Sequence, residues 1–219
     1  MTRKVFWDDP YRTTLDTHIS VVNGDVVTVA ETIFYALSGG QESDAGTIAG
    51  HTVVHARKEG SEIFYTLPTG HGLATGDNVR IEIDWIRRYR LMRLHFAAEL
   101  VLELTCKMLA NGGKIVEKIG AHIAQDKARI DFDWPENISS LFVQLTAQAQ
   151  AIIDADTVIV SAFSDETNER RYWEVAGLAR VPCGGTHLKR TGEVGGLSLK
   201  RRNVGRGKER IEIYLANGD

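Results

Sequence analysis

The sequence predicts an α+β protein in two parts, because short alternating segments fill its first 85 residues and two long helical segments follow. In residues 1–85, brief runs of alternating apolar and polar residues recur between glycine-bearing turns. Residues 85–110 contain neither Gly nor Pro and are rich in Leu, Arg, Ala and Glu. These are strong helix formers, so this segment is predicted to be one long helix.

The first part is predicted to consist of short strands at 18–22, 25–29, 51–57, 62–67 and 78–83. Asn23-Gly24-Asp25 lies between the first two strands and is a typical hairpin signal. Strands this short and evenly spaced favour a small barrel or a strongly curved sheet. We therefore expect residues 1–85 to form a small β-barrel-like domain.

The second part, residues 86–219, is expected to be an α+β domain that opens with the long helix. Apolar spacing of three and four gives that helix one buried face, formed by Leu91, Leu94, Ala98, Val101, Thr105 and Met108. Asn111-Gly112-Gly113 supplies its C-terminal stop. A second helix is predicted at 138–155, with strands at 114–117, 129–132, 157–163, 197–202 and 210–215. The strand at 157–163 is expected to be buried.

Composition limits the class of protein. No apolar run approaches the roughly 18 residues of a membrane span, and the N-terminus lacks the apolar core of a secretion signal. The two cysteines, Cys106 and Cys183, are too few for a disulfide scaffold. Neither a Walker motif nor a dinucleotide-binding signature stands out. We expect a soluble cytoplasmic protein without membrane association.

The net charge of −3 speaks against a nucleic-acid partner, but the charge is unevenly distributed. Residues 1–85 hold 6 basic and 12 acidic side chains, whereas residues 86–219 hold 20 and 17. Eight basic residues gather in 187–210, against only Glu193 and Glu209. A phosphate backbone responds to such a local potential. The alternative is an ordinary solvated surface.

Two pairs of potential metal ligands are spaced four residues apart. His95 and Glu99 lie on one face of the predicted long helix, and Cys183 and His187 lie in a glycine-rich loop. Zinc accepts thiolate, imidazole and carboxylate ligands, usually four in number. The four residues are therefore a candidate metal site. The alternatives are a buried core histidine, a solvated Glu99 and a cysteine that merely fits a tight turn.

A second candidate is the glycine-rich segment Ser38-Gly39-Gly40-Gln41. Glycine lacks a Cβ, so backbone can approach a ligand closely there. The Gln41 amide offers a donor and an acceptor, which suits a small polar group such as a hydroxyl. The alternative is an ordinary β-turn.

Four segments, in order along the chain, resemble motifs of the alanyl-tRNA editing family. This family comprises the editing domain of alanyl-tRNA synthetase and stand-alone AlaX-type proteins. VPCGGTHLKRTGEVG at 181–195 is similar to its C-terminal motif, and RLMRLHFAAEL at 90–100 to its first metal motif. TIFYALSGGQ at 32–41, followed by DAG at 44–46, resembles its glycine-rich motif. RIDFD at 129–133 matches a further segment.

The resemblance implies one zinc ion per chain, with His95, Cys183 and His187 as ligands. Where the family usually has a second histidine, this chain has Glu99, whose carboxylate is also able to ligate zinc. The resemblance also places Thr32, Gly39, Gly40 and Gln41 in the substrate pocket. For the RNA backbone we predict contacts from arginines at the start of the long helix and in the basic C-terminal segment, namely Arg87, Arg88, Arg201 and Arg202.

The activity that the resemblance implies is ATP-independent trans-editing: hydrolysis of mischarged tRNA(Ala), with Ser-tRNA(Ala) as first substrate and Gly-tRNA(Ala) as second. A pocket sized for alanine cannot strongly reject an analogue that adds a hydroxyl or lacks a methyl group, so a second site must remove the errors. No catalytic residue is assigned beyond the metal site, and no oligomeric state is predicted. Two alternatives stay open: a non-catalytic zinc- and RNA-binding protein on an editing scaffold, and a deacylase of another aminoacyl-tRNA.

Overall fold

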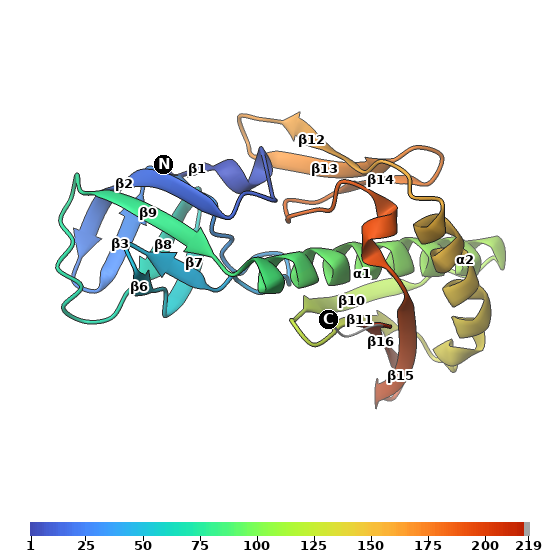
Figure 1. The fold of residues 1–219 in the computed structure, drawn as a ribbon. Coiled ribbons are helices and arrows are strands. Elements are labelled where there is room, and N and C mark those ends of the chain that lie inside the picture. The colour runs from blue at the N-terminus through green and yellow to red at the C-terminus, as the bar shows by residue number, and fades with distance from the viewer. Residues whose placement is uncertain (217–219) are drawn as a thin grey trace. The chain divides into compact units, whose positions relative to one another are not determined.

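The computed structural model describes residues 1–216, so the last three residues of the predicted second domain lie outside the described residues. Strands combine with the two α-helices α1 and α2, and the predicted α+β class is confirmed (Figure 1). The chain divides into two compact units. The N-terminal unit runs from Met1 to Arg90, and the C-terminal unit begins at Leu91. No helix within residues 1–216 combines the length and apolar character that a membrane span needs.

The N-terminal unit is built on a curled seven-stranded sheet in the order β6-β5-β9-β2-β3-β8-β7 (Figure 1). Its strands are β2 (Thr14–Asn23), β3 (Val26–Val29), β5 (Gly46–Ile48), β6 (His51–Thr52), β7 (His55–Glu59), β8 (Glu62–Thr66) and β9 (Asn78–Ile83). A small parallel pair, β1 (Arg3–Lys4) and β4 (Glu31–Thr32), flanks the 3-10 helix η1 (Val5–Trp7). The strand β2 pairs with β9 through its first half and with β3 through its second. Closure of this sheet into a barrel stays a prediction.

Most strands predicted for residues 1–85 correspond to strands of the N-terminal unit. The predicted hairpin joins β2 to β3, and Gly24 adopts the positive φ of 59° that this tight turn requires. The predicted strand 51–57 is instead divided into β6 and β7. The Val53 N–H donates to Gly46, whereas the Val54 N–H donates to Thr66, so the chain changes pairing partner at this point.

The C-terminal unit contains most of the 27-residue helix α1 (Trp85–Asn111) together with two antiparallel sheets. One sheet has the order β10-β11-β16-β15 and the other β12-β13-β14. Their strands are β10 (Glu117–Ile123), β11 (Ala128–Asp133), β12 (Val160–Asp165), β13 (Arg170–Val175), β14 (Ala179–Pro182), β15 (Leu197–Gly205) and β16 (Lys208–Leu215). The remaining helices are η2 (Ile138–Leu141), α2 (Phe142–Asp154) and η3 (Thr191–Val194).

The helix α1 is buried on more than the predicted face. Five of the six residues of that face are buried, and Met108 is half-buried. Phe96 and Leu100 are also fully buried, and the Phe96 ring meets Trp173 of β13 edge-on at 5.3 Å. The first residues of this helix belong to the N-terminal unit, and those from Leu91 onward belong to the C-terminal unit.

Two strands predicted in the second part are displaced. Lys114 and Ile115 are exposed and Val116 is half-buried. The segment extends the helix stop, because the Lys114 N–H donates to the Leu109 carbonyl, and β10 begins only at Glu117. The strand expected at 157–163 starts at Val160, and it is a largely exposed edge strand rather than a buried one. The prediction was wrong here because only Ile159 of that apolar run enters the core.

Candidate metal centre, glycine loop and basic residues

The candidate metal ligands come from one helix and one loop. His95 and Glu99 lie one turn apart on α1, and Cys183 and His187 lie in the loop that follows β14. The Cys183 N–H donates to the Arg171 carbonyl and so extends the pairing of β14 with β13 into the loop. Beyond His187, a backbone bond from the Ile159 N–H to the Lys189 carbonyl anchors the far end of the loop. The ligand atoms of the four residues all lie within 4.8 Å of one another.

Three of the separations between these atoms suit a tetrahedral ion. Cys183 Sγ is 3.5 Å from His95 Nε2, and the Glu99 carboxylate oxygens are 3.4 Å from His95 Nε2 and 3.4 Å from His187 Nε2. Four atoms bound to zinc at about 2.0–2.3 Å would be about 3.3–3.6 Å apart. The carboxylate of Glu99 therefore stands within the cluster, and the group could hold a metal ion.

The four side chains change one another's ionisation. Burial opposes ionisation of the Cys183 thiol, but the histidines outweigh it, His95 most, and lower the pKa to about 7. Burial likewise opposes ionisation of Glu99, yet both histidines hold its pKa far below the usual range. In return, Glu99 and Cys183 raise the pKa of His95 and of His187 in spite of their burial. Near neutral pH the cluster thus favours the Glu99 carboxylate and makes the Cys183 thiolate available, whereas the two imidazoles tend to hold protons. Imidazole binds a metal only in its neutral form, so metal binding at this cluster would release protons.

Two buried atoms of this cluster lack a hydrogen bond among the described residues: Oε2 of Glu99 and Nε2 of His187. They face each other at 3.4 Å. A buried polar atom without a partner is costly, and a metal ion between these two atoms would satisfy both. This is an observation of fit that does not depend on the sequence resemblance.

The structure adds one polar neighbour that the sequence analysis missed. Ser161 of β12 places its Oγ 3.3 Å from His187 Nδ1. Such an outer contact orients an imidazole so that its other nitrogen faces the remaining ligands. No local signal in the sequence marks this serine, because it sits on an edge strand far along the chain from His187.

The glycine segment in the N-terminal unit forms a tight turn. The N–H and C=O groups of Ser38 and Gln41 bond each other, while Gly39 and Gly40 take positive φ values of 60° and 87°. Gln41 is fully buried and Gly39 is exposed. The β-turn expected as the alternative is thus present, and the role of this turn in a substrate pocket stays a prediction.

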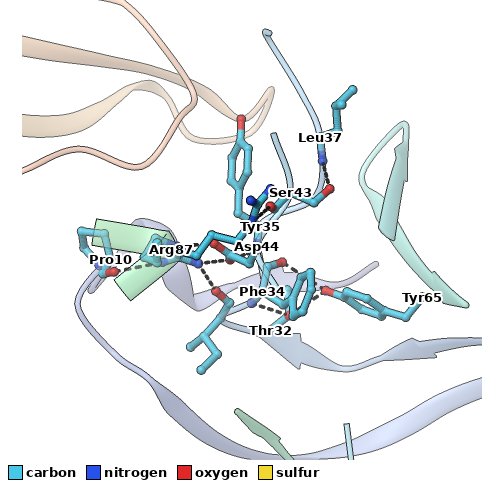
Figure 2. Close-up of polar contacts among 11 residues, drawn as sticks. Pro10, Thr32, Phe34, Tyr35, Leu37, Ser43, Asp44, Tyr65 and Arg87 are labelled. Carbon is cyan, nitrogen blue, oxygen red and sulfur yellow. Dashed lines mark hydrogen bonds and ion pairs between the residues drawn. The ribbon is translucent and has the colours of Figure 1, made fainter. Parts of the chain in front are cut away.

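The hydroxyl of Thr32 is held within the N-terminal unit (Figure 2). It lies 2.7 Å from the Tyr65 hydroxyl and accepts a hydrogen bond of 2.9 Å from the Phe34 N–H. The Tyr65 hydroxyl also contacts the Phe34 carbonyl at 3.2 Å. These bonds fix the backbone that leads into the glycine turn.

Asp44 organises a second buried network beside that turn (Figure 2). Its carboxylate accepts from the Tyr35 N–H at 2.6 Å and from Arg88 Nε at 2.7 Å. The Arg88 guanidinium also donates to the carbonyls of Ile33 and Pro10, and its side chain is 0% exposed. A guanidinium enclosed in this way has no face left for a phosphate. The prediction that Arg88 contacts RNA is therefore wrong.

The other predicted RNA contacts differ in their availability. Arg87 is half-buried and donates to the Ser43 carbonyl and to the Glu42 carboxylate. Arg201 makes a two-pronged bond to the buried carboxylate of Glu209, at 2.5 and 2.6 Å. Arg202 is the most exposed of the four, with 64% of its side chain accessible.

Known relatives place these observations in a family. The alanyl-tRNA editing protein AlaX-M of Pyrococcus horikoshii is 31% identical over 217 residues, covering 98% of this chain and 98% of the relative. The chain belongs to the AlaX-M family of alanyl-tRNA editing proteins. The resemblance drawn from four motifs is thereby confirmed. No model of a protein family matches the chain.

Other relatives show the same relation. The AlaX-M protein of Methanosarcina barkeri is 29% identical over 99% of this chain and 100% of its own length. The alanine–tRNA ligase of Ignicoccus hospitalis is 34% identical over 97% of this chain, but the match covers only 26% of the ligase. The similarity to AlaX-M proteins thus runs from end to end, whereas the ligase carries the matching sequence as one part of a longer chain.

Proposed function

We propose that this protein is a stand-alone trans-editing hydrolase of mischarged tRNA(Ala), with Ser-tRNA(Ala) as its first substrate and Gly-tRNA(Ala) as its second. The reaction is hydrolysis of the ester that joins the amino acid to the terminal ribose. The observation that carries the proposal is the cluster of His95, Glu99, Cys183 and His187, whose ligand atoms lie within 4.8 Å of one another. It occurs in a chain that matches AlaX-M relatives over nearly its whole length.

In this proposal, the resident metal is zinc, one ion per chain. A thiolate with two imidazoles is a ligand set that suits zinc. When bound, zinc supplies Lewis-acid chemistry that can polarise a carbonyl or lower the pKa of a water molecule. Glu99 and Cys183 contribute two negative charges to its binding, and Ser161 holds the ring of His187 in place. The helix α1 would then be the metal-bearing helix of an editing domain at 86–219.

The amino acid of the substrate would bind in the glycine-motif domain, residues 1–85, which we propose to be barrel-like. The Gln41 amide would recognise the serine hydroxyl, because it offers both a donor and an acceptor. Gly39 and Gly40 would allow the backbone to approach the substrate. Thr32 would also belong to this pocket, where its hydroxyl contacts the Tyr65 hydroxyl and the Phe34 N–H.

The decisive assay compares three substrates of the purified protein: Ser-tRNA(Ala), Gly-tRNA(Ala) and correctly charged Ala-tRNA(Ala). We expect hydrolysis of the first two and sparing of the third. Binding of all three without hydrolysis would instead support a non-catalytic RNA-binding protein. Hydrolysis confined to an aminoacyl-tRNA of another identity would support a different deacylase.

Glu99 permits a sharper test of the metal site. If its carboxylate binds the ion, Glu99→Ala should raise the dissociation constant for zinc by at least about tenfold. Glu99→His should retain the ion, because it restores the ligand type usual in the family at a position already within 3.4 Å of both histidines. Zinc content after dialysis against a graded chelator measures both effects. Equal retention by wild type and Glu99→Ala would exclude Glu99 as a ligand.

A further inference from the structure

Side-chain alternation separates the two neighbouring arginines of β15. In the pairing of β15 with β16, Arg201 lies opposite Ile211, whereas Arg202 lies opposite Arg210. Successive side chains of a strand point to opposite faces of its sheet. Arg201 therefore shares the face of the buried residues Glu209 and Ile211, and Arg202 shares the other.

That other face, called here the outer face, gathers charge from neighbouring strands of the sheet. Lys200 lies opposite Glu212 on β16, and Asp131 and Arg129 of β11 lie opposite Arg210 and Glu212. Lys127, which precedes β11, also reaches this face through its contact with Glu212. Five cations therefore surround Asp131 and Glu212, namely Lys127, Arg129, Lys200, Arg202 and Arg210. At one end of the sheet, Asp133 faces Lys208 and Glu117, so the basic excess does not extend there.

The two carboxylates among these cations, Asp131 and Glu212, lie beneath them. Glu212 has only 3% of its side chain exposed and contacts Lys127 at 2.8 Å and Arg202 at 3.2 Å. Asp131 is 14% exposed and binds Arg129 and Arg210. Each negative charge is thus shared by two cations and withdrawn from solvent. Lys200 and Arg202 are exposed, so the surface shows its positive charges.

We propose that the outer face binds the phosphate backbone of RNA, and specifically that of the tRNA named in the proposed function, on which this inference rests. Guanidinium groups match phosphate oxygens with paired donors. Although the chain carries a net charge of −3, this local excess of three positive charges determines what the face attracts.

The aromatic residue of the outer face argues for backbone contact rather than base recognition. Lys200 Nζ and Lys127 Nζ lie 4.8 and 5.8 Å from the centre of the Tyr214 ring. The Tyr214 hydroxyl is also engaged, because it donates to Glu212 at 3.0 Å. The ring and its hydroxyl thus already serve the charged network of the face itself. The face therefore positions RNA without reading its sequence.

The test neutralises two exposed cations together, in the variant Lys200→Gln/Arg202→Gln. Binding of tRNA(Ala) is measured by fluorescence anisotropy over a series of KCl concentrations. We expect the dissociation constant at physiological salt to rise about tenfold, and the log–log salt slope to fall by about 2. Lys200→Arg/Arg202→Lys preserves both charges and should bind as wild type does. Circular dichroism establishes that each variant is folded.

A matched control removes two charges elsewhere. Arg57→Gln/Lys58→Gln changes β7 by the same net charge, so its salt slope should equal that of wild type. An unchanged slope in Lys200→Gln/Arg202→Gln would overturn the inference, even when wild type hydrolyses Ser-tRNA(Ala). If Lys200→Gln/Arg202→Gln lost the binding to phosphatidylserine vesicles that wild type shows, but still bound tRNA as wild type does, the outer face would be assigned to membranes. That result would overturn the inference too. Wild-type protein that binds tRNA but hydrolyses no substrate would refute the proposed function alone.

Discussion

Replacing Cys183 with alanine should remove the metal and abolish deacylation while both α-helices remain folded. Its sulfur lies 3.5 Å from His95 Nε2, and its thiol pKa of about 7 makes the thiolate available near neutral pH. The residue sits in a loop after β14, so its loss removes a ligand without interrupting a helix or strand. Wild type should contain about one zinc per chain and Cys183→Ala almost none. We expect kcat/KM for Ser-tRNA(Ala) to fall at least about a hundredfold.

The second cysteine supplies the control for that experiment. Cys106 is half-buried on α1 and is not part of the ligand cluster. Cys106→Ala should therefore retain zinc and deacylation. Metal content by elemental analysis, deacylation and far-ultraviolet circular dichroism are compared in the two variants. Wild type that is metal-free after gentle purification yet fully active would refute zinc dependence.

The helical half of this site could be predicted from the sequence, and the loop half could not. A spacing of four residues on a helix places His95 and Glu99 on one face whatever surrounds the helix. The same spacing in a loop fixes no geometry. Cys183 and His187 reach the helix only because β13 and a backbone bond from Ile159 anchor the two ends of their loop. Those partners are distant in sequence, so ligand chemistry made the meeting of the two pairs a candidate, and the resemblance to the family strengthened it.

Charge patterns in the sequence likewise could not show which arginines are accessible. Arg87 and Arg88 are neighbours in a basic segment, yet Arg88 is enclosed together with its partner Asp44. Because Asp44 lies 44 residues earlier, the local charge pattern does not reveal this pair. Arg201 and Arg202 point to opposite faces, which follows from strand alternation once the register of β15 is known. The prediction of a buried strand around Ile159 was wrong for a similar reason. Its neighbours Val158 and Val160 are about half exposed on a sheet edge, a position that apolar composition does not reveal.

The other large effect is expected at the buried pair formed by Arg88 and Asp44. Both side chains have 0% exposure. A charge left in such an interior without its partner lowers stability by about 3–5 kcal/mol. Asp44→Ala should therefore lower the free energy of unfolding by about that amount, measured by urea denaturation of the full chain. An unfolding curve that coincides with wild type would show that the pair contributes nothing to stability.

Asp44→Asn separates the charge from the shape of the side chain. Asparagine keeps an oxygen that can accept the Tyr35 N–H, which Asp44 accepts at 2.6 Å, but it leaves the Arg88 charge unpaired. We therefore expect a smaller loss of stability than in Asp44→Ala. Because Tyr35 leads directly into the turn at Ser38–Gln41, both variants should raise KM for Ser-tRNA(Ala) while zinc stays at one ion per chain. That pattern is the opposite of the one expected for Cys183→Ala, so the two experiments together separate the positioning of the glycine turn from the binding of the metal.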